Sequence, residues 1–190
     1  MADAVHGRGG RAGPRHLGDR KSGVHSRLAL LLVGAVLVLV GCANGPTTQS
    51  TPAGTADALA FTGTTLGGAE LDAATLSGQP VALWFWAPWC TICRAEAPEV
   101  ASVAAQFEDQ VTFIGIPGLG PVDDMKRFVD ETGTEGFEHV IDADGSLWQR
   151  FGVVSQPSFV FVATDGTTQS FTGALPVDEL RRMASALAAG

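Results

Sequence analysis

The stretch WFWAPWCTICRAEAP, residues 84–98, holds two of the chain's three cysteines, separated by two residues. It overlaps VALWFW, residues 81–86, which is apolar at every position, as expected for a central strand covered on both faces. Beyond it, apolar residues recur at helical spacing as far as Phe107. We therefore expect Cys90 where a buried strand ends and a helix begins, with Cys93 one turn inside that helix.

This position predicts a chemistry for the two thiols. Unpaired N–H groups and the positive end of the helix dipole favour an anion at the first turn, so we expect the pKa of the Cys90 thiol to lie below its usual value of about 8.5. Residues three apart share a helical face, so Cys90 and Cys93 can form a disulfide without rebuilding of the backbone. A Cys90 thiolate that attacks a foreign disulfide gives a mixed disulfide, which Cys93 then resolves. Such a cycle needs no cofactor and no metal.

The remaining pattern predicts an α/β fold. A weak alternation around Gly67 and Gly68 predicts a small N-terminal β-hairpin. Strands are expected over residues 81–86, 111–116, 158–163 and 168–172, and helices over residues 90–107, 122–131, 146–151 and 177–189. The order is a βαβ unit, a helix, a hairpin and a final helix, which predicts a central mixed sheet flanked by helices on both faces.

The start of the chain has the pattern of an export signal. A polar and basic stretch precedes residues 28–40, which carry no charge and are shorter than the roughly 20 apolar residues of a membrane span. This segment ends in LVGC, residues 39–42, which resembles the lipobox of bacterial lipoproteins. The resemblance implies that Cys42 is lipidated and becomes the first residue of the mature chain, anchored at the outer face of the cytoplasmic membrane.

The rest of the chain divides into a tether and one domain. Residues 43–58 are mostly Gly, Pro, Ser, Thr and Ala, a composition that cannot bury a core. We therefore expect a lipoprotein signal peptide over residues 1–41, a flexible tether over residues 42–58 and a single domain over residues 59–190. After residue 41 the chain carries six Lys and Arg against eighteen Asp and Glu, a net charge of −12. So acidic a body argues against nucleic acid as a partner.

Two motifs together resemble the thioredoxin superfamily, and within it the membrane-tethered extracytoplasmic group that includes TlpA, ResA and the DsbE-type proteins. WAPWCTIC, residues 86–93, resembles the active-site element of that family, in which Trp89 precedes the nucleophile. FGVVSQPSFVF, residues 151–161, resembles its second signature, in which a cis-proline packs against the active-site disulfide. The resemblance implies that role for Pro157, and we expect Gln156 to contact the client. Trp89, beside the thiol, either contacts the client or packs against the domain.

The resemblance extends over nearly all of residues 59–190. FTGTTLGGAELDAATLSGQPV, residues 61–81, resembles the hairpin that the TlpA group adds before the thioredoxin core. The implied fold is therefore a thioredoxin fold with an added N-terminal β-hairpin.

The chain departs from thioredoxin itself at one position. Thioredoxin has a buried aspartate six residues before the first cysteine, and this chain has Trp84 there, so that proton relay is absent. The group often carries a glutamate six residues after the first cysteine, where this chain has Glu96. If buried, the Glu96 carboxyl would have a raised pKa and could exchange protons with the Cys93 sulfur. The alternative is a solvated glutamate on the helix surface.

Three other aromatic residues have simpler interpretations. His139 has no other histidine near it in the sequence, and we expect it at the surface. Trp86 and Trp148 are expected in the core.

Other functional classes fit less well. The related copper-delivering Sco proteins use CxxxC and a distal His, and a structural zinc site needs two further ligands. A permanent staple between Cys90 and Cys93 closes so small a loop that it adds little stability. Peroxiredoxins need Pro and Thr ahead of their cysteine, where this chain has Leu83 and Ala87.

The direction of electron flow stays open at this stage. An oxidant would donate its disulfide to folding clients, whereas a reductant would keep apocytochrome or other thiols reduced. The resemblance to actinobacterial DsbE-type lipoproteins favours the oxidant, and a reductant of the cytochrome c maturation type is the alternative. The implied partners are exported proteins with cysteine thiols or disulfides and a membrane redox protein that recycles the pair.

Overall fold

The computed structural model describes residues 58–190. The predicted signal peptide, the predicted lipidation site Cys42 and the predicted tether as far as residue 57 lie outside the described residues. No helix among residues 58–190 is long and apolar enough to cross a membrane.

A five-stranded mixed sheet forms the centre of the domain, in the order β5-β4-β3-β6-β7. Its strands are β3 (Val81–Trp86), β4 (Thr112–Pro117), β5 (Glu138–His139), β6 (Ser158–Val162) and β7 (Thr168–Thr172). Strand β3 pairs in parallel with β4 and antiparallel with β6, and β7 runs antiparallel to β6. The predicted mixed sheet is therefore confirmed, apart from the short edge strand β5, which the sequence pattern missed.

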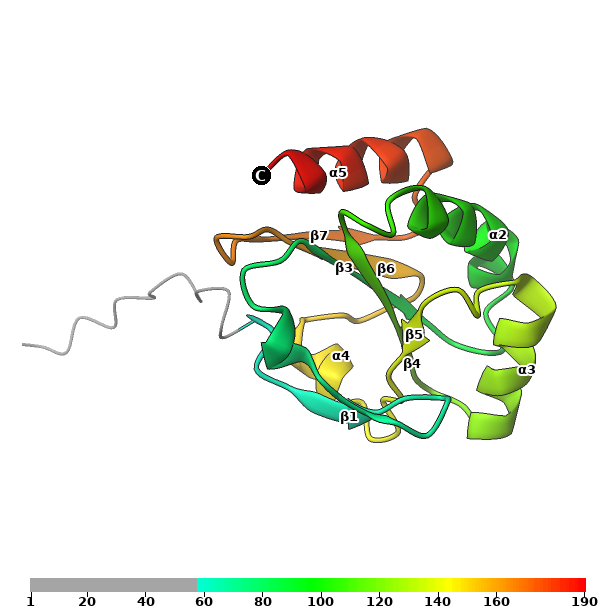
Figure 1. Ribbon diagram of the computed structural model, residues 1–190. Helices are drawn as coiled ribbons and strands as arrows, with labels where there is room; N and C mark the ends of the chain where they lie inside the picture. The colour runs from blue at the N-terminus through cyan, green and yellow to red at the C-terminus, as the bar shows by residue number, and fades with distance from the viewer. Residues whose placement is uncertain (1–57) are drawn as a thin grey trace, which may run out of the picture. The chain divides into compact units, whose positions relative to one another are not determined.

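Helices cover one face of this sheet (Figure 1). These are α2 (Thr91–Gln106), α3 (Val122–Thr132) and α5 (Val177–Ala189). The residues of β3 that point toward them are Ala82, Trp84 and Trp86, which share one buried cluster with side chains of all three helices. Alternation along the strand explains this, since every second side chain of β3 faces the same side.

The opposite face is covered by smaller elements. The hairpin of β1 (Thr62–Thr64) and β2 (Glu70–Asp72), the 3-10 turn η1 (Ala73–Leu76) and helix α4 (Ser146–Arg150) supply its cover. Val81, Leu83 and Phe85 of β3 point into this second cluster. The hairpin is confirmed, with Thr62 opposite Asp72. Since both faces of β3 are covered, all six of its residues are buried.

The hairpin also reaches the edge of the central sheet. Leu66 N–H donates to the His139 carbonyl at 2.8 Å, and Ile141 N–H donates to the Thr64 carbonyl at 3.0 Å. These bonds satisfy backbone groups that β5 would otherwise leave unpaired at the sheet edge.

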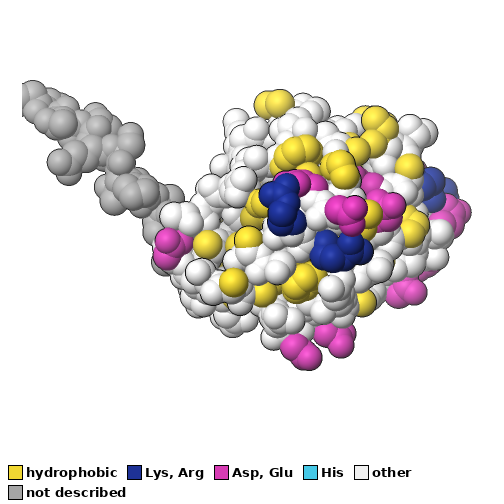
Figure 2. Space-filling view, turned by 90° about the horizontal axis from the view of Figure 1, so that it is seen from above, with side chains coloured by type: hydrophobic (Ala, Val, Ile, Leu, Met, Phe, Trp, Pro, Cys, Tyr) yellow, Lys and Arg dark blue, Asp and Glu magenta, His cyan; other side chains and the backbone are white. Residues whose placement is uncertain are grey.

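The face that α5 crosses carries charges of both signs, and Figure 2 shows basic and acidic side chains next to one another there. Arg181 pairs with Asp178 at 2.8 Å, and Arg182 pairs with Glu179. These ion pairs lie along the exposed side of a helix, where each contributes little to stability.

His139 is buried, so the expected surface position is wrong. Its ring is 3% exposed and lies between two partners. Trp86 Nε1–H donates to His139 Nδ1 at 3.3 Å, so Nε2 carries the proton and donates to the Thr134 carbonyl at 2.8 Å. Gly115 on the neighbouring strand makes room for it, because a Cβ there would overlap the imidazole. Burial lowers the pKa of His139 from 6.5 to about 4, although the bond to Thr134 opposes this.

His139 should make the fold less stable in acid. Because its pKa is about 4 in the folded chain and 6.5 ordinarily, the unfolded chain binds the proton first as the pH falls. The contribution of His139 to the free energy of unfolding should be complete above pH 6.5 and should decrease by on the order of 3 kcal/mol by pH 4. Chemical denaturation of the wild type and of His139→Gln across this range measures it. A difference between the two proteins that is constant with pH would contradict the assignment.

Candidate active site

The two cysteines lie at the start of α2, as the sequence predicts. Strand β3 ends at Trp86, and residues 87–89 lead to Cys90, which is the N-cap of α2 with extended backbone. Cys90 and Cys93 form a disulfide, with their Cα atoms 5.3 Å apart. Cys93 N–H donates to Cys90 Sγ at 3.0 Å, the hydrogen bond that a capping side chain accepts. The same donor and the helix dipole favour a thiolate at Cys90 once the disulfide is reduced.

The two sulfurs differ in accessibility. Cys90 is 6% exposed, whereas Cys93 is completely buried. Two large exposed side chains are next to the cysteines in the chain: Trp89, before Cys90, is 58% exposed, and Ile92, between Cys90 and Cys93, is 54% exposed. An incoming sulfur therefore meets Cys90 first, and Cys93 reacts from inside the protein.

The second signature also has the expected geometry. The Gln156–Pro157 peptide bond is cis, Pro157 is buried and Gln156 is half-buried. Ser158 lies opposite Phe85 in the pairing of β6 with β3, which places Pro157 at the end of β3 that leads to the cysteines. The catalytic role of Pro157 and the client contact of Gln156 stay predictions.

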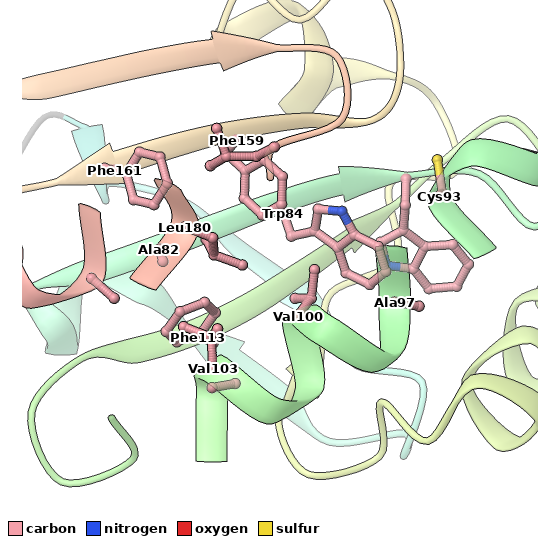
Figure 3. Close-up of a cluster of buried hydrophobic side chains, with 14 of the residues drawn as sticks. Ala82, Trp84, Cys93, Ala97, Val100, Val103, Phe113, Phe159, Phe161 and Leu180 are labelled. Atoms are coloured by element: carbon pink, nitrogen blue, oxygen red, sulfur yellow. The ribbon is translucent and has the colours of Figure 1, made fainter. Parts of the chain in front are cut away.

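Glu96 lies on the inner face of α2 and is 6% exposed, so a solvated surface glutamate is wrong. One carboxylate oxygen, Oε1, accepts from Trp84 Nε1 at 2.9 Å, and the other, Oε2, accepts from the backbone N–H of Leu175 at 3.3 Å. Figure 3 shows Trp84 between the sheet and α2, near Cys93 and Ala97. Glu96 follows Cys93 by one helical turn, so the two side chains are neighbours on one buried face.

The burial of Glu96 changes its protonation. Desolvation raises the pKa of Glu96 from 4.5 to about 7, while the hydrogen bonds from Trp84 and Leu175 hold it lower than burial alone would. Glu96 therefore changes its protonation state near neutral pH, next to the buried sulfur. This is the range in which a general acid or base works best.

Trp84 is a site residue that the sequence did not reveal as one. In the sequence, Trp84 indicates only that the aspartate of thioredoxin is absent, yet its indole N–H is a donor to the Glu96 carboxylate. A signal was present, since Glu96, Val100 and Val103 have the spacing of one helical face, which predicts a buried carboxyl in need of a donor.

Trp89 is held from the next loop. Its Nε1–H donates to the Leu119 carbonyl at 2.7 Å. Gly120 of the same loop packs on Pro88, where an added Cβ would lie 2.5 Å from Cγ. Leu119 itself is 55% exposed and has a φ of 58°, in the left-handed region. The loop thus fixes Trp89 beside Cys90 with its ring facing solvent.

Two other tryptophans belong to the core rather than to the site. Trp86 and Trp148 are both buried, as predicted.

Comparison with known proteins agrees with this geometry. The model of the AhpC/TSA family matches residues 55–171. The soluble secreted antigen MPT53 of Mycobacterium tuberculosis is 42% identical over 156 residues, which are 80% of this chain and 87% of that protein.

Two solved structures are also similar. One is dsbF of MTB, in mixed oxidised and reduced forms, with 42% identity and a TM-score of 0.67 over 68% of this chain and 96% of that one. The other is a secreted Mycobacterium tuberculosis disulfide oxidoreductase homologous to E. coli DsbE, with 44% identity and a TM-score of 0.65 over 68% and 98% of the two chains. The chain therefore belongs to the AhpC/TSA family, within the thioredoxin superfamily, and its solved relatives include disulfide oxidoreductases related to DsbE.

Proposed function

We propose that this thiol-disulfide oxidoreductase works outside the cytoplasm as an oxidant that donates its Cys90–Cys93 disulfide to the cysteines of exported proteins. The observation that carries the proposal is the position of Cys90 Sγ at the N-cap of α2, where it accepts the Cys93 N–H. A helix N-terminus stabilises the thiolate, and stabilisation of the reduced form makes a disulfide a stronger oxidant. The secreted relative MPT53 supports an extracytoplasmic location.

The reaction follows from the accessibility of the two sulfurs. A client thiolate attacks Cys90 Sγ, the Cys90–Cys93 bond breaks, and Cys93 leaves as a thiolate. A second client thiolate then attacks the client sulfur of the mixed disulfide, and Cys90 leaves as a thiolate. The client loses two electrons and gains a disulfide, and the protein takes up these electrons as the two thiolates of its reduced pair. A membrane redox partner that takes these electrons back would complete the cycle.

The reduction potential of the Cys90–Cys93 pair tests the direction. The proposed oxidising role predicts a value near −120 mV, the range of strong oxidants, at equilibrium with glutathione. The measurement can follow the fluorescence of the tryptophans, with Cys93→Ala as a control that lacks the couple. A value near −270 mV would instead assign the reducing role.

Glu96 can exchange a proton with Cys93. When Cys93 leaves as a thiolate, its negative charge forms at a site with no exposure to water. A protonated Glu96 can donate its proton to that sulfur, so that two buried negative charges do not coexist. In the reverse reaction the Glu96 carboxylate accepts the proton from the Cys93 thiol.

This role predicts a pH dependence of client oxidation. The ionisation of the client thiol affects the wild type and Glu96→Gln equally, so it cancels in the ratio of their rates. This ratio should decrease by roughly a hundredfold as the pH rises through about 7, because Glu96 then loses its proton. Trp84→Phe removes a hydrogen bond that lowers the pKa of Glu96, so the decrease should move to higher pH. Stopped-flow rates across this range measure both changes. A ratio that does not vary with pH would exclude Glu96 from proton transfer.

The lipid anchor and the client class are further parts of the proposal. The predicted export signal, the LVGC motif of residues 39–42 and the apolar side chains beside Cys90 support it. A lipidated Cys42 would keep the domain at the membrane, near both emerging clients and the redox partner.

One trapping experiment checks the anchor and the clients together. Cys93→Ala cannot resolve mixed disulfides, so exported proteins should accumulate on Cys90 in the membrane fraction of cells. With Cys42→Ser added, the same complexes should appear in the medium. Mass spectrometry identifies the clients, and Cys90→Ala with Cys93→Ala is the control. Trapped cytoplasmic proteins would contradict the location, and complexes that stay on the membrane without Cys42 would contradict the anchor.

A further inference from the structure

A cleft of about 910 Å³ lies at the edge of the central sheet, where the edge strand is short. Strand β5 pairs with β4 only at Ile114 and Gly115, so Thr112 and Phe113 at the start of β4 have no neighbouring strand on that side. Both of these residues line the cleft. The other elements around it are the β1–β2 hairpin, η1, the C-terminal half of α2 and the residues before β5. The cleft has the volume of a ligand site.

The cleft and the disulfide lie toward opposite ends of α2. Cys90 is the N-cap of this helix, whereas the cleft is lined by residues of its C-terminal half, from Ala101 to Ala105. At about 1.5 Å per residue, roughly 20 Å of helix separates Cys90 from Ala105. A ligand in the cleft would therefore leave Cys90 open to clients.

The rim of the cleft carries only negative charge. Five exposed carboxylates line the cleft, and no Lys, Arg or His does; they belong to Glu70, Asp72, Glu108, Glu135 and Glu138. Glu70 accepts from the Thr64 hydroxyl at 2.8 Å, and Asp72 accepts from the backbone N–H of Ala74 at 3.0 Å. Among the described residues, no hydrogen bond or ion pair engages the other three carboxylates. These three can each pair with a cation of a ligand.

The floor of the cleft is apolar. Leu71 and Leu76 are half-buried near the hairpin, and Phe137 is half-buried before β5. Val111 and Phe113, at the start of β4, are buried. An apolar floor inside an acidic rim favours a ligand with both characters, because apolar burial supplies affinity and the carboxylates select the charge.

One polar side chain in the wall of the cleft has no partner. Thr65 is 2% exposed, and its hydroxyl makes no hydrogen bond within the described residues. A buried hydroxyl without a partner is unfavourable, so nearly all such groups in folded proteins are paired. Because Thr65 lines the cleft, a polar group of a ligand there can supply the partner that this hydroxyl lacks.

We propose that this cleft binds an extended, basic segment of another protein, in which an apolar residue stands between Lys or Arg residues. The apolar side chain packs on the floor, the cations pair with the three unengaged carboxylates, and a backbone group bonds with the Thr65 hydroxyl. The open edge of β4 favours a peptide over a small cation, since an unpaired sheet edge is a template for a further strand. The chain can hold this partner while exchange proceeds at Cys90.

Labelled peptides test the cleft in the purified chain by fluorescence anisotropy. A peptide of alternating Lys and Leu should bind about tenfold more tightly than peptides of alternating Glu and Leu or of alternating Lys and Ser. One triple variant neutralises the unengaged carboxylates of the rim: Glu108→Gln, Glu135→Gln and Glu138→Gln. It should weaken this binding about tenfold, because three weak ion pairs are lost together. The matched control removes as much charge outside the cleft and should keep the binding: Asp123→Asn, Asp165→Asn and Asp178→Asn.

Thr65→Val separates a binding role from a structural one. Loss of the unpaired hydroxyl should raise the melting temperature of the free chain, yet it should weaken the Lys-Leu peptide about fivefold. Thiol exchange at Cys90 should be unchanged in every one of these variants, whichever way electrons flow, and a slower exchange would contradict two separate sites.

Two results would overturn the proposal. One is equal binding of the Lys-Leu peptide by the wild type and by the triple variant of the rim. The other is displacement of that peptide by spermidine at the same concentration, which would indicate a site for small amines instead of a protein segment.

Discussion

The burial of β3 on both faces is the constraint on which the site depends. A strand with no solvent side must place alternate side chains into two separate clusters, and this directs Trp84 toward α2. The C-terminal end of β3 leads directly to the active site. There the chain turns and starts helix α2, whose N-cap is Cys90. One element therefore fixes both the position of the reactive sulfur and the donor for Glu96. The hydrophobic burial that stabilises the domain and the geometry of the chemistry have a common cause.

Glu96 is costly to bury, and its environment shows how the fold accommodates it. An ionised carboxyl without partners in the core would be strongly unfavourable, so the group either binds a proton or finds donors. Here both occur, since two N–H groups reach the carboxylate and its pKa is still raised to about 7. A second negative charge on the neighbouring Cys93 would add repulsion in a medium of low dielectric constant. Loss of a proton at one group would thus favour its retention at the other, and the proposed role of Glu96 would couple electron transfer to proton transfer in this way.

The sequence predicts those elements of the fold that depend on the pattern of residues within one segment. The six apolar residues of β3, the helical spacing in α2 and the turn at Gly68 each report on their own segment, and these elements form as expected. His139 was placed wrongly because its burial depends on Trp86 and Gly115, which come from two other strands. A single histidine in an acidic segment gives no sign of such partners. The bond from Trp84 to Glu96 also joins residues of different elements, so only the pairing of the sheet with α2 reveals it.

The accessible surface of the site is apolar, whereas its buried part holds the polar and reactive groups. Inside are a sulfur, a carboxyl and satisfied donors, while the surface beside Cys90 carries Trp89, Ile92 and Leu119. An exchange enzyme must hold many different clients and release each one. A single apolar side chain that is buried against such a surface contributes roughly 1.5–3 kcal/mol, enough to favour some clients and too little to keep the product bound. Because the covalent mixed disulfide supplies the rest of the binding and ends when the reaction is complete, a small apolar surface is the arrangement that suits this chemistry.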